Sequence, residues 1–207
     1  SEEERHIRFK HAPRMYPFRA LHYCLDYANI KLSDVEAVAI NLNLDAYTDG
    51  TLKDFFAQMR NQWPDIDDKS IQWQNALLKF YDRDSYVSRQ HYHWRKAFGD
   101  IPFPAVCSYG HHYIHAFHAV RQSPFNSSVV LTIDGSGDQH CTTLWESKGD
   151  ELELLREITM PNSLGWVYAA FTEYLGFDAY DGEYKVMGLA AFGKPDQEIK
   201  AKVEKIV

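Results

Sequence analysis

The stretch Ser128–Asp138, SVVLTIDGSGD, decides the fold of this chain. Its β-branched first half predicts a strand that ends at Asp134. The next residues, Gly-Ser-Gly at 135–137, predict a tight turn, and Cys141–Glu146 would return as an antiparallel partner strand. A carboxylate at the end of a buried strand, beside glycines, can bind a metal and a phosphate together. The alternative is an ordinary hairpin connection without a ligand.

Two histidines stand upstream of this strand, in GHHYIHAFH at residues 110–118. His111 and His115 are four residues apart, so on a helix they share a face and can bind one metal ion. Imidazole is a common ligand of Zn, Fe, Cu and Ni. His112 points off this face, and we expect neither His112 nor His118 to be a ligand. The alternative, histidines of the surface or core, loses weight because an aspartate ends the following strand.

The remaining pattern predicts an α/β fold, a mixed sheet with flanking helices and with antiparallel strands near an edge. Helices are expected where apolar residues recur every three or four positions, and strands where Val and Ile cluster. We expect helices at 18–28, 51–63, 164–175, 183–191 and from 196 onward, one or two helices within 65–99, and strands at 35–40, 105–107, 128–134, 141–146 and 152–158.

Composition narrows the class of protein. The chain has 207 residues, of which 45% are hydrophobic and 25% charged, which fits one large or two small globular units. The net charge of −7 argues against a nucleic-acid binder, which usually has a basic face. No apolar run reaches the roughly 18 residues of a membrane span, and no signal peptide is visible. Cys24, Cys107 and Cys141 are widely spaced, so we expect no disulfide framework and a cytoplasmic location.

Seven motifs together resemble the O-carbamoyltransferases of the NodU/CmcH family, which modify nodulation factors, cephem antibiotics and aminoglycosides. The motifs are EEER at 2–5, RFKH at 8–11, GHHYIHA at 110–116, LTIDGSGD at 131–138, NSLGWVY at 162–168, YLGF at 174–177 and GEYKVMGLA at 182–190. The resemblance spans most of the chain and is weak at 45–105, which we expect to be a helical insertion.

The resemblance implies a Kae1-like N-terminal domain with an actin/sugar-kinase ATPase core of the ribonuclease-H-like type. In this family a C-terminal YrdC-like domain makes carbamoyl adenylate from carbamoyl phosphate and ATP, and the Kae1-like domain passes the carbamoyl group to a hydroxyl. We expect residues 1–207 to be part of the N-terminal domain, incomplete at both ends. The first phosphate loop would precede Ser1, and the YrdC-like domain would lie outside the chain. We therefore expect a carbamoyltransferase (EC 2.1.3 type) whose 207 residues alone are inactive.

The resemblance also implies a divalent metal held by His111, His115 and Asp134, with a later aspartate beyond Val207. Iron is the metal of the best-matching relatives, and this ligand set also suits Zn²⁺ and Mn²⁺. The metal would neutralise phosphate charge and orient the mixed anhydride. Asp134 is also the candidate catalytic base for the acceptor hydroxyl. Metal coordination would weaken that role, because it lowers the pKa of the carboxyl.

The expected nucleotide- and phosphate-binding residues come from four of the motifs. Gly135 and Gly137 would let backbone N–H groups approach phosphate oxygens. Ser163 and Gly165 would line the nucleotide pocket, with a helix N-terminus behind them. The full set is Lys10, Asp134, Gly135, Ser136, Gly137, Asp138, Ser163, Gly165, Glu183 and Lys185.

Several of these residues also have an interpretation without a ligand. Lys10 would then be a solvated lysine near the terminus. Glu183 and Lys185 would be a pair on a helix surface, and Asn162 and Ser163 would be helix caps.

The sequence leads to one main functional hypothesis, an ATP- and metal-dependent O-carbamoyltransferase. It would pass a carbamoyl group from carbamoyl phosphate, via carbamoyl adenylate, to a hydroxyl of a small-molecule or natural-product acceptor. The expected partners are this acceptor and a nucleotide, with a homodimer left open, and neither a nucleic acid nor a membrane.

Three alternatives stand beside this hypothesis. The chain could transfer a threonylcarbamoyl or carbamoyl group to a macromolecule, or it could be a non-catalytic nucleotide- and metal-binding fragment. The run 183–190 favours the small-molecule branch, and the acidic net charge disfavours tRNA. An unrelated hydrolase is disfavoured, because no activated nucleophile of the Ser-His or Cys-His kind can be placed.

Overall fold

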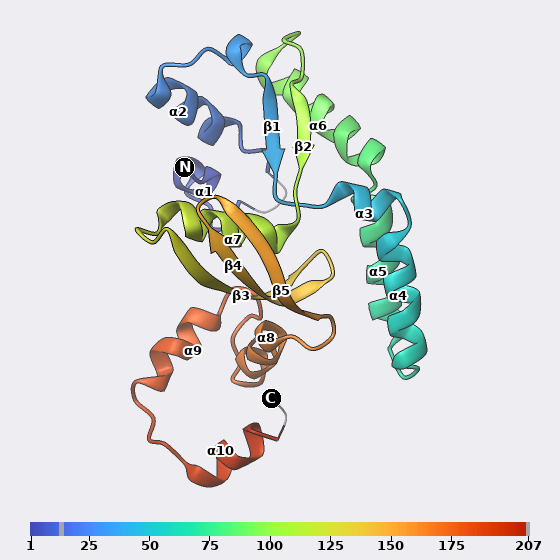
Figure 1. Ribbon diagram of the computed structural model, residues 1–207, viewed down its shortest axis with the longest axis vertical. Coiled ribbons are helices and arrows are strands. Elements are labelled where there is room, and N and C mark those ends of the chain that lie inside the picture. Colours follow the sequence, from blue (N-terminus) through green and yellow to red (C-terminus); the bar gives the residue numbers. More distant parts are fainter. Residues whose placement is uncertain (13–14, 206–207) are drawn as a thin grey trace. The chain divides into compact units, whose positions relative to one another are not determined.

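The structure is a computed structural model that describes residues 1–12 and 15–205 (Figure 1). The chain divides into two units, Ser1–Tyr109 and Gly110–Val207, each of which is described by itself. Both units combine helices with a small sheet, which confirms an α/β fold.

A pair of parallel strands and a set of helices form the N-terminal unit. Strand β1 (Ala37–Ile40) pairs with β2 (Ala105–Ser108), so that Ala37 lies opposite Ala105. Parallel neighbours need a long crossover connection, and here it consists of helices. The helices of this unit are α1 (Glu3–Ile7), α2 (Phe18–Ala28), the 3₁₀ helix η1 (Leu32–Asp34), α3 (Leu44–Thr48), α4 (Thr51–Gln62), α5 (Asp68–Phe80) and α6 (Arg83–Phe98).

Helices α4 to α6 occupy the segments predicted to be helical, and together with α3 they provide most of the core of this unit. Leu44, Leu52, Phe56 and Trp94 are all nearly inaccessible to solvent. The identification of 45–105 as an insertion stays a prediction. The two five-residue helices α1 and α3 were not predicted, because so short a segment shows no helical periodicity.

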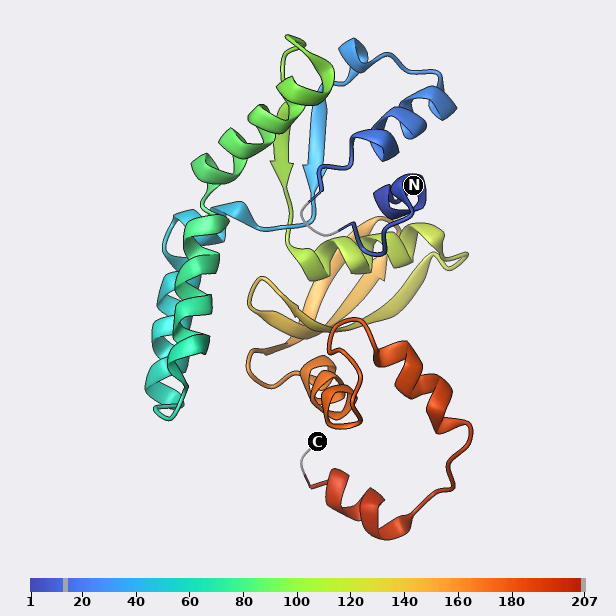
Figure 2. The ribbon, with the colours of Figure 1, turned by 180° about the vertical axis from the view of Figure 1, so that it is seen from behind.

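An antiparallel sheet of order β3-β4-β5 is the centre of the C-terminal unit. Helix α7 lies on one face of this sheet, and α8 packs against β3 from the other side (Figures 1 and 2). The elements of this unit are α7 (His111–Gln122), β3 (Ser127–Gly137), β4 (His140–Lys148), β5 (Glu151–Thr159), α8 (Leu164–Tyr174), α9 (Glu183–Ala190) and α10 (Gln197–Val203).

Two details of the predicted sheet are wrong. The strands form two separate sheets rather than one mixed sheet. The predicted turn at 135–137 is also misplaced, because β3 continues to Gly137 with irregular pairing after Ile133, and the turn falls at Asp138–Gln139. Asp138 adopts a φ of 55°, a left-handed conformation that aspartate tolerates better than most residues, so this turn needs no glycine.

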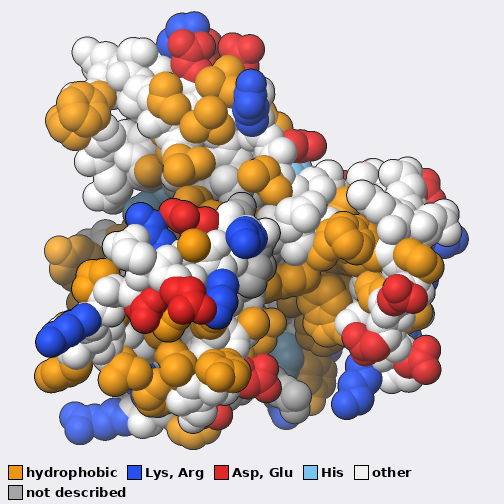
Figure 3. Space-filling view, turned by 90° about the horizontal axis from the view of Figure 1, so that it is seen from below, with side chains coloured by type: hydrophobic (Ala, Val, Ile, Leu, Met, Phe, Trp, Pro, Cys, Tyr) orange, Lys and Arg blue, Asp and Glu red, His pale blue; other side chains and the backbone are white. Residues whose placement is uncertain are grey.

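The two faces of β3 differ in polarity. Thr132 points to the α7 side and is buried, whereas Val129, Leu131 and Ile133 on the other face are more than half exposed. Apolar side chains are common on the surface more generally, and Figure 3 shows them scattered among charged groups. No helix among residues 1–12 and 15–205 is long and apolar enough to cross a bilayer.

Candidate metal centre

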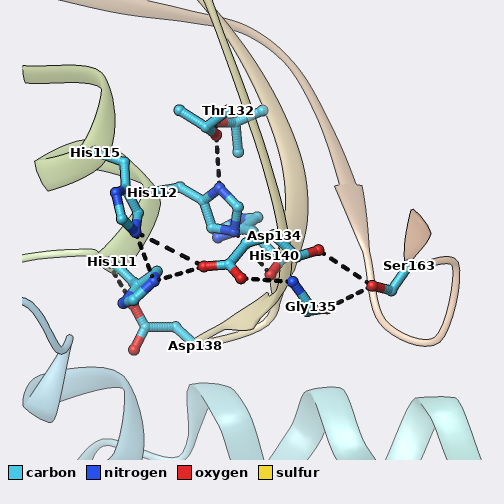
Figure 4. A network of polar contacts seen from close by, with 10 residues as sticks. His111, His112, His115, Thr132, Asp134, Gly135, Asp138, His140 and Ser163 are labelled. Atoms are coloured by element: carbon cyan, nitrogen blue, oxygen red, sulfur yellow. Dashed lines mark hydrogen bonds and ion pairs between the residues drawn. The ribbon is translucent and has the colours of Figure 1, made fainter. Parts of the chain in front are cut away.

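Three side chains from α7 and β3 converge at one point of the C-terminal unit (Figure 4). His111 Nε2 lies 2.9 Å from Asp134 Oδ2 and 3.0 Å from His115 Nε2. His115 Nε2 lies 3.7 Å from the same carboxylate oxygen. The helix brings the two rings together because they are one turn apart, and β3 supplies the carboxylate from the neighbouring sheet.

This group has the chemistry of a metal site. One candidate ligand atom from each of the three residues lies within 4.8 Å of the other two. Two imidazoles and a carboxylate are a donor set that suits Zn²⁺, Fe²⁺ and Mn²⁺, and three protein ligands leave coordination positions open for other groups. The structure thus brings together the three residues that the sequence predicts as ligands. Their binding of a metal stays a prediction.

Asp134 has the charge that a ligand needs. Burial, the largest influence, raises the pKa of its carboxyl. The hydrogen bond with His111, the N–H of Gly135 at 2.6 Å from Oδ1 and the charge of the histidines act in the opposite direction and prevail. The pKa of Asp134 therefore lies below its ordinary value, which favours the ionised form. The same shift makes Asp134 a weaker general base than an unperturbed carboxylate.

Asp138 holds the first turn of α7. Its Oδ2 accepts a hydrogen bond from the backbone N–H of His111 at 3.0 Å. A carboxylate at this position satisfies one of the free N–H groups of the helix N-terminus and interacts favourably with the helix dipole. The structure therefore places Asp138, predicted as a phosphate contact, where it positions a candidate ligand. A direct phosphate contact stays a prediction.

Gly137 provides the space that His111 occupies. A Cβ atom on Gly137 would lie 2.2 Å from Cδ2, 2.4 Å from Cγ and 2.6 Å from Cβ of His111. Real Cβ atoms do not approach other heavy atoms so closely, so glycine is needed here for close packing. From the sequence we expected Gly137 to be important for a different reason, the approach of its backbone to a phosphate.

Replacing Gly137 with alanine is expected to weaken Zn²⁺ binding about 10- to 100-fold, the range seen when groups that orient metal ligands are lost. The added methyl group would push the His111 ring and the start of α7 away from Asp134. Calorimetric titration of Zn²⁺ into the variant measures the effect. Unchanged affinity would mean that the ring does not need this space.

A cavity of about 610 Å³ opens beside Asp134. Its wall includes four residues predicted to bind nucleotide, together with apolar side chains and two tyrosines. The lining residues are Ile133, Asp134, Gly135, Leu164, Gly165, Tyr168, Tyr180 and Glu183. Tyr168 and Tyr180 were not predicted from the sequence as residues of this site. Tyr168 lies four residues after Leu164 on the same helix face, a spacing that could have revealed it, whereas Tyr180 lies in a loop without a pattern.

Ser163 has a structural role between α8 and β3. Its hydroxyl oxygen accepts a hydrogen bond from Trp166 N at 3.1 Å, which confirms the helix-cap interpretation. The hydroxyl itself donates to the carbonyl oxygen of Gly135 at 2.6 Å. Gly165 allows α8 to come close, because its Cα lies against the backbone of Asp134 and Gly135. Ser163 does not line the cavity, so any effect on a nucleotide would be through the position of these residues.

The contacts of the remaining predicted residues do not point to one role. Glu183 lines the cavity, and its Oε1 accepts from Tyr180 N at 2.7 Å. Lys185 is exposed, with its Nζ 6.0 Å from the ring centre of Phe177. Ser136 is part of the irregular end of β3, and Lys10 lies in a turn of the N-terminal unit. Ligand roles for these residues stay predictions.

Comparison with known proteins gives one family and several relatives. The sequence matches the family described as "Carbamoyltransferase N-terminus" over residues 1–207. It is 33% identical over 195 residues to Nodulation protein NolNO of Sinorhizobium fredii, and this alignment covers 94% of this chain and 26% of that protein. An uncharacterised protein of Synechocystis is 33% identical over 211 residues, covering 94% of the chain and 31% of its own length. Nodulation protein NolO of Bradyrhizobium diazoefficiens is 41% identical over 87 residues, covering 42% of the chain and 16% of its own length. The chain thus spans about a quarter to a third of the length of the first two relatives.

Proposed function

Since the chain belongs to the carbamoyltransferase N-terminus family, we propose that it acts in ATP- and metal-dependent O-carbamoyl transfer. The carbamoyl group would come from carbamoyl phosphate, via carbamoyl adenylate, and pass to a hydroxyl of a small molecule. The observation that carries this proposal is the convergence of His111, His115 and Asp134 beside a cavity large enough for a nucleotide. The proposed fold is the Kae1-like, actin/sugar-kinase type of ATPase core.

The charge of the cavity supports a role for a metal. Its lining residues in the described chain include the carboxylates of Asp134 and Glu183 but no lysine or arginine. A nucleotide bound there would bring its phosphates close to these carboxylates, and like charges repel strongly in a half-buried site. A divalent cation on His111, His115 and Asp134 would neutralise the phosphate charge and orient the group to be transferred.

The protein's own residues have separate tasks in this proposal. Ile133 and Leu164 would give a nucleotide apolar contacts, and Tyr168 and Tyr180 would offer it aromatic faces. Asp134 would also accept the proton of the acceptor hydroxyl, a role limited by its lowered pKa. A small-molecule acceptor is supported by the relatives named nodulation proteins and by the resemblance to enzymes that modify nodulation factors.

Removal of the metal tests the proposal. With Fe²⁺ or Zn²⁺ present, we expect ADP to bind at least about tenfold more tightly than after treatment with a chelator, a difference of about 1.4 kcal/mol. Calorimetric titration of ADP measures both affinities. Adenosine, which has no phosphates, is the matched control and should bind equally under both conditions. Equal ADP affinity with and without metal would contradict a metal-assisted nucleotide site.

A further inference from the structure

A third histidine of α7, His112, faces away from the candidate metal centre and into the sheet. It is only 2% exposed and is the largest buried polar side chain of the C-terminal unit. Its Nδ1 lies 2.6 Å from Thr132 Oγ1, and its Nε2 lies 3.0 Å from the carbonyl oxygen of His140 (Figure 4). Both ring nitrogens therefore have a partner on the sheet.

His112 is part of a buried chain of hydrogen bonds within the C-terminal unit. A carbonyl oxygen only accepts, so His112 Nε2 must carry a proton and donate it to His140. The other ring nitrogen, Nδ1, is bonded to the hydroxyl of Thr132. Thr132 Oγ1 in turn lies 2.6 Å from Thr143 Oγ1, and Trp145 Nε1 donates to Thr143 Oγ1 at 2.5 Å. These bonds link Trp145 through two threonines to His112.

This chain of hydrogen bonds lies next to the candidate ligands at two places. Thr132 lies two residues before Asp134 on β3. His140 begins β4, directly after the turn whose Asp138 holds the N–H of His111. The ring of His112 therefore joins the first turn of α7 to the strand that carries the carboxylate and to the turn that holds the helix end.

We propose that His112 is a positioning residue of the metal centre, which sets the rotation of α7 on the sheet so that His111 and His115 face Asp134. This inference rests on the proposed metal site. Apolar contacts alone would let a helix rotate or slide by small amounts at little cost, whereas directional bonds in a buried site select one arrangement. A buried polar group is costly unless it is fully bonded, so a histidine that only filled space would be a poor choice here.

The experiment compares Zn²⁺ affinity with stability in three variants. His112→Phe keeps a ring but removes both hydrogen bonds, and we expect Zn²⁺ to bind about 10- to 100-fold more weakly, as after loss of other groups that orient ligands. Thr132→Val keeps the imidazole but removes its hydroxyl partner at Nδ1, together with the bond to Thr143 Oγ1. It keeps the test available if His112→Phe fails to fold. We expect it to weaken Zn²⁺ binding by a smaller factor.

Ser147→Val is the matched control. Ser147 is fully buried in the same sheet, where its hydroxyl pairs with Ser128 Oγ at 2.8 Å, far along the strands from the ligands. It should lower the melting temperature and leave Zn²⁺ affinity unchanged. Nitrogen-15 NMR of the imidazoles in the metal-free protein adds a test without metal, and it should show the His112 proton on Nε2.

The outcomes separate this inference from the proposed function. If the unchanged protein binds Zn²⁺ and both His112→Phe and Thr132→Val bind it equally well, His112 has no positioning role. A His112 ring without a proton on Nε2 would also overturn the inference, because that nitrogen could not then donate to the carbonyl oxygen of His140. If the unchanged protein binds no Zn²⁺, the proposed metal site fails, and the role of His112 fails with it.

Discussion

Replacing His111 with alanine is expected to weaken Zn²⁺ binding more than about 100-fold, beyond the range seen for groups that only orient ligands. His111 contributes the most closely placed of the three candidate ligands, with its Nε2 about equally distant from Asp134 and His115. Its loss would leave one imidazole and one carboxylate, too few to hold a divalent ion tightly. The measurement is metal content after gel filtration, together with calorimetric titration of Zn²⁺. ADP affinity should fall in the same variant, because the metal would no longer offset the phosphate charge.

His118→Ala is the control for this experiment. His118 lies on the same helix and is exposed, outside the group of candidate ligands. The variant removes the same side chain from the same secondary structure and should bind Zn²⁺ and ADP as the unchanged protein does. If His111→Ala and His118→Ala behaved alike, the histidines of α7 would not form a metal site, and the assignment would rest on the family alone.

Replacing Gly165 with alanine is expected to destabilise the protein by about 3 kcal/mol, the upper part of the usual cost of overpacking. The new Cβ would lie 2.5 Å from Gly135 N and 2.7 Å from the carbonyl carbon and oxygen of Asp134. All three are backbone atoms, which cannot rotate away as the end of a side chain can. Helix α8 would have to move off β3. A thermal unfolding curve should show the melting temperature lowered by about 6 to 12 °C, given the scaling for a protein of this size.

Gly188→Ala is the matched control for this substitution. Gly188 lies inside α9, and a Cβ atom there would meet nothing within 4 Å. The change should be neutral or stabilise by up to about 1 kcal/mol, because alanine restricts the unfolded chain and suits a helix. Equal melting temperatures for Gly165→Ala and Gly188→Ala would show that α8 does not need its close approach to β3.

The sequence was most informative where a pattern repeats over many residues. Helix α2 has the predicted bounds, Phe18–Ala28, because its apolar residues recur with helical spacing. The hairpin of β3 and β4 and the third strand were also predicted, starting from the long run of Val, Thr and Ile in β3. The two histidines were found because a spacing of four residues has a fixed meaning on a helix.

The sequence was less informative where tertiary contacts determine the position and role of a residue. The glycines at 135 and 137 are typical of a turn in the sequence. In the structure they allow close packing against Trp166 and His111, which the sequence alone does not show. The buried chain from Trp145 to His112 could not be predicted, because threonines on a strand are equally suited to solvent. Tyr180 reaches the cavity from a loop in a left-handed conformation, with a φ of 66°, which no periodic pattern encodes.

The separation of the candidate ligands along the chain has a consequence for the dynamics of the C-terminal unit. His111 and Asp134 are 23 residues apart, one in the first turn of a helix and the other near the end of a strand. A bound ion would therefore act as a reversible cross-link that closes this loop and opposes local unfolding of α7. At a metal concentration 100 times the dissociation constant, the ion would stabilise the folded form by about 2.7 kcal/mol. Amide hydrogen exchange along the helix would therefore slow as the metal concentration rises.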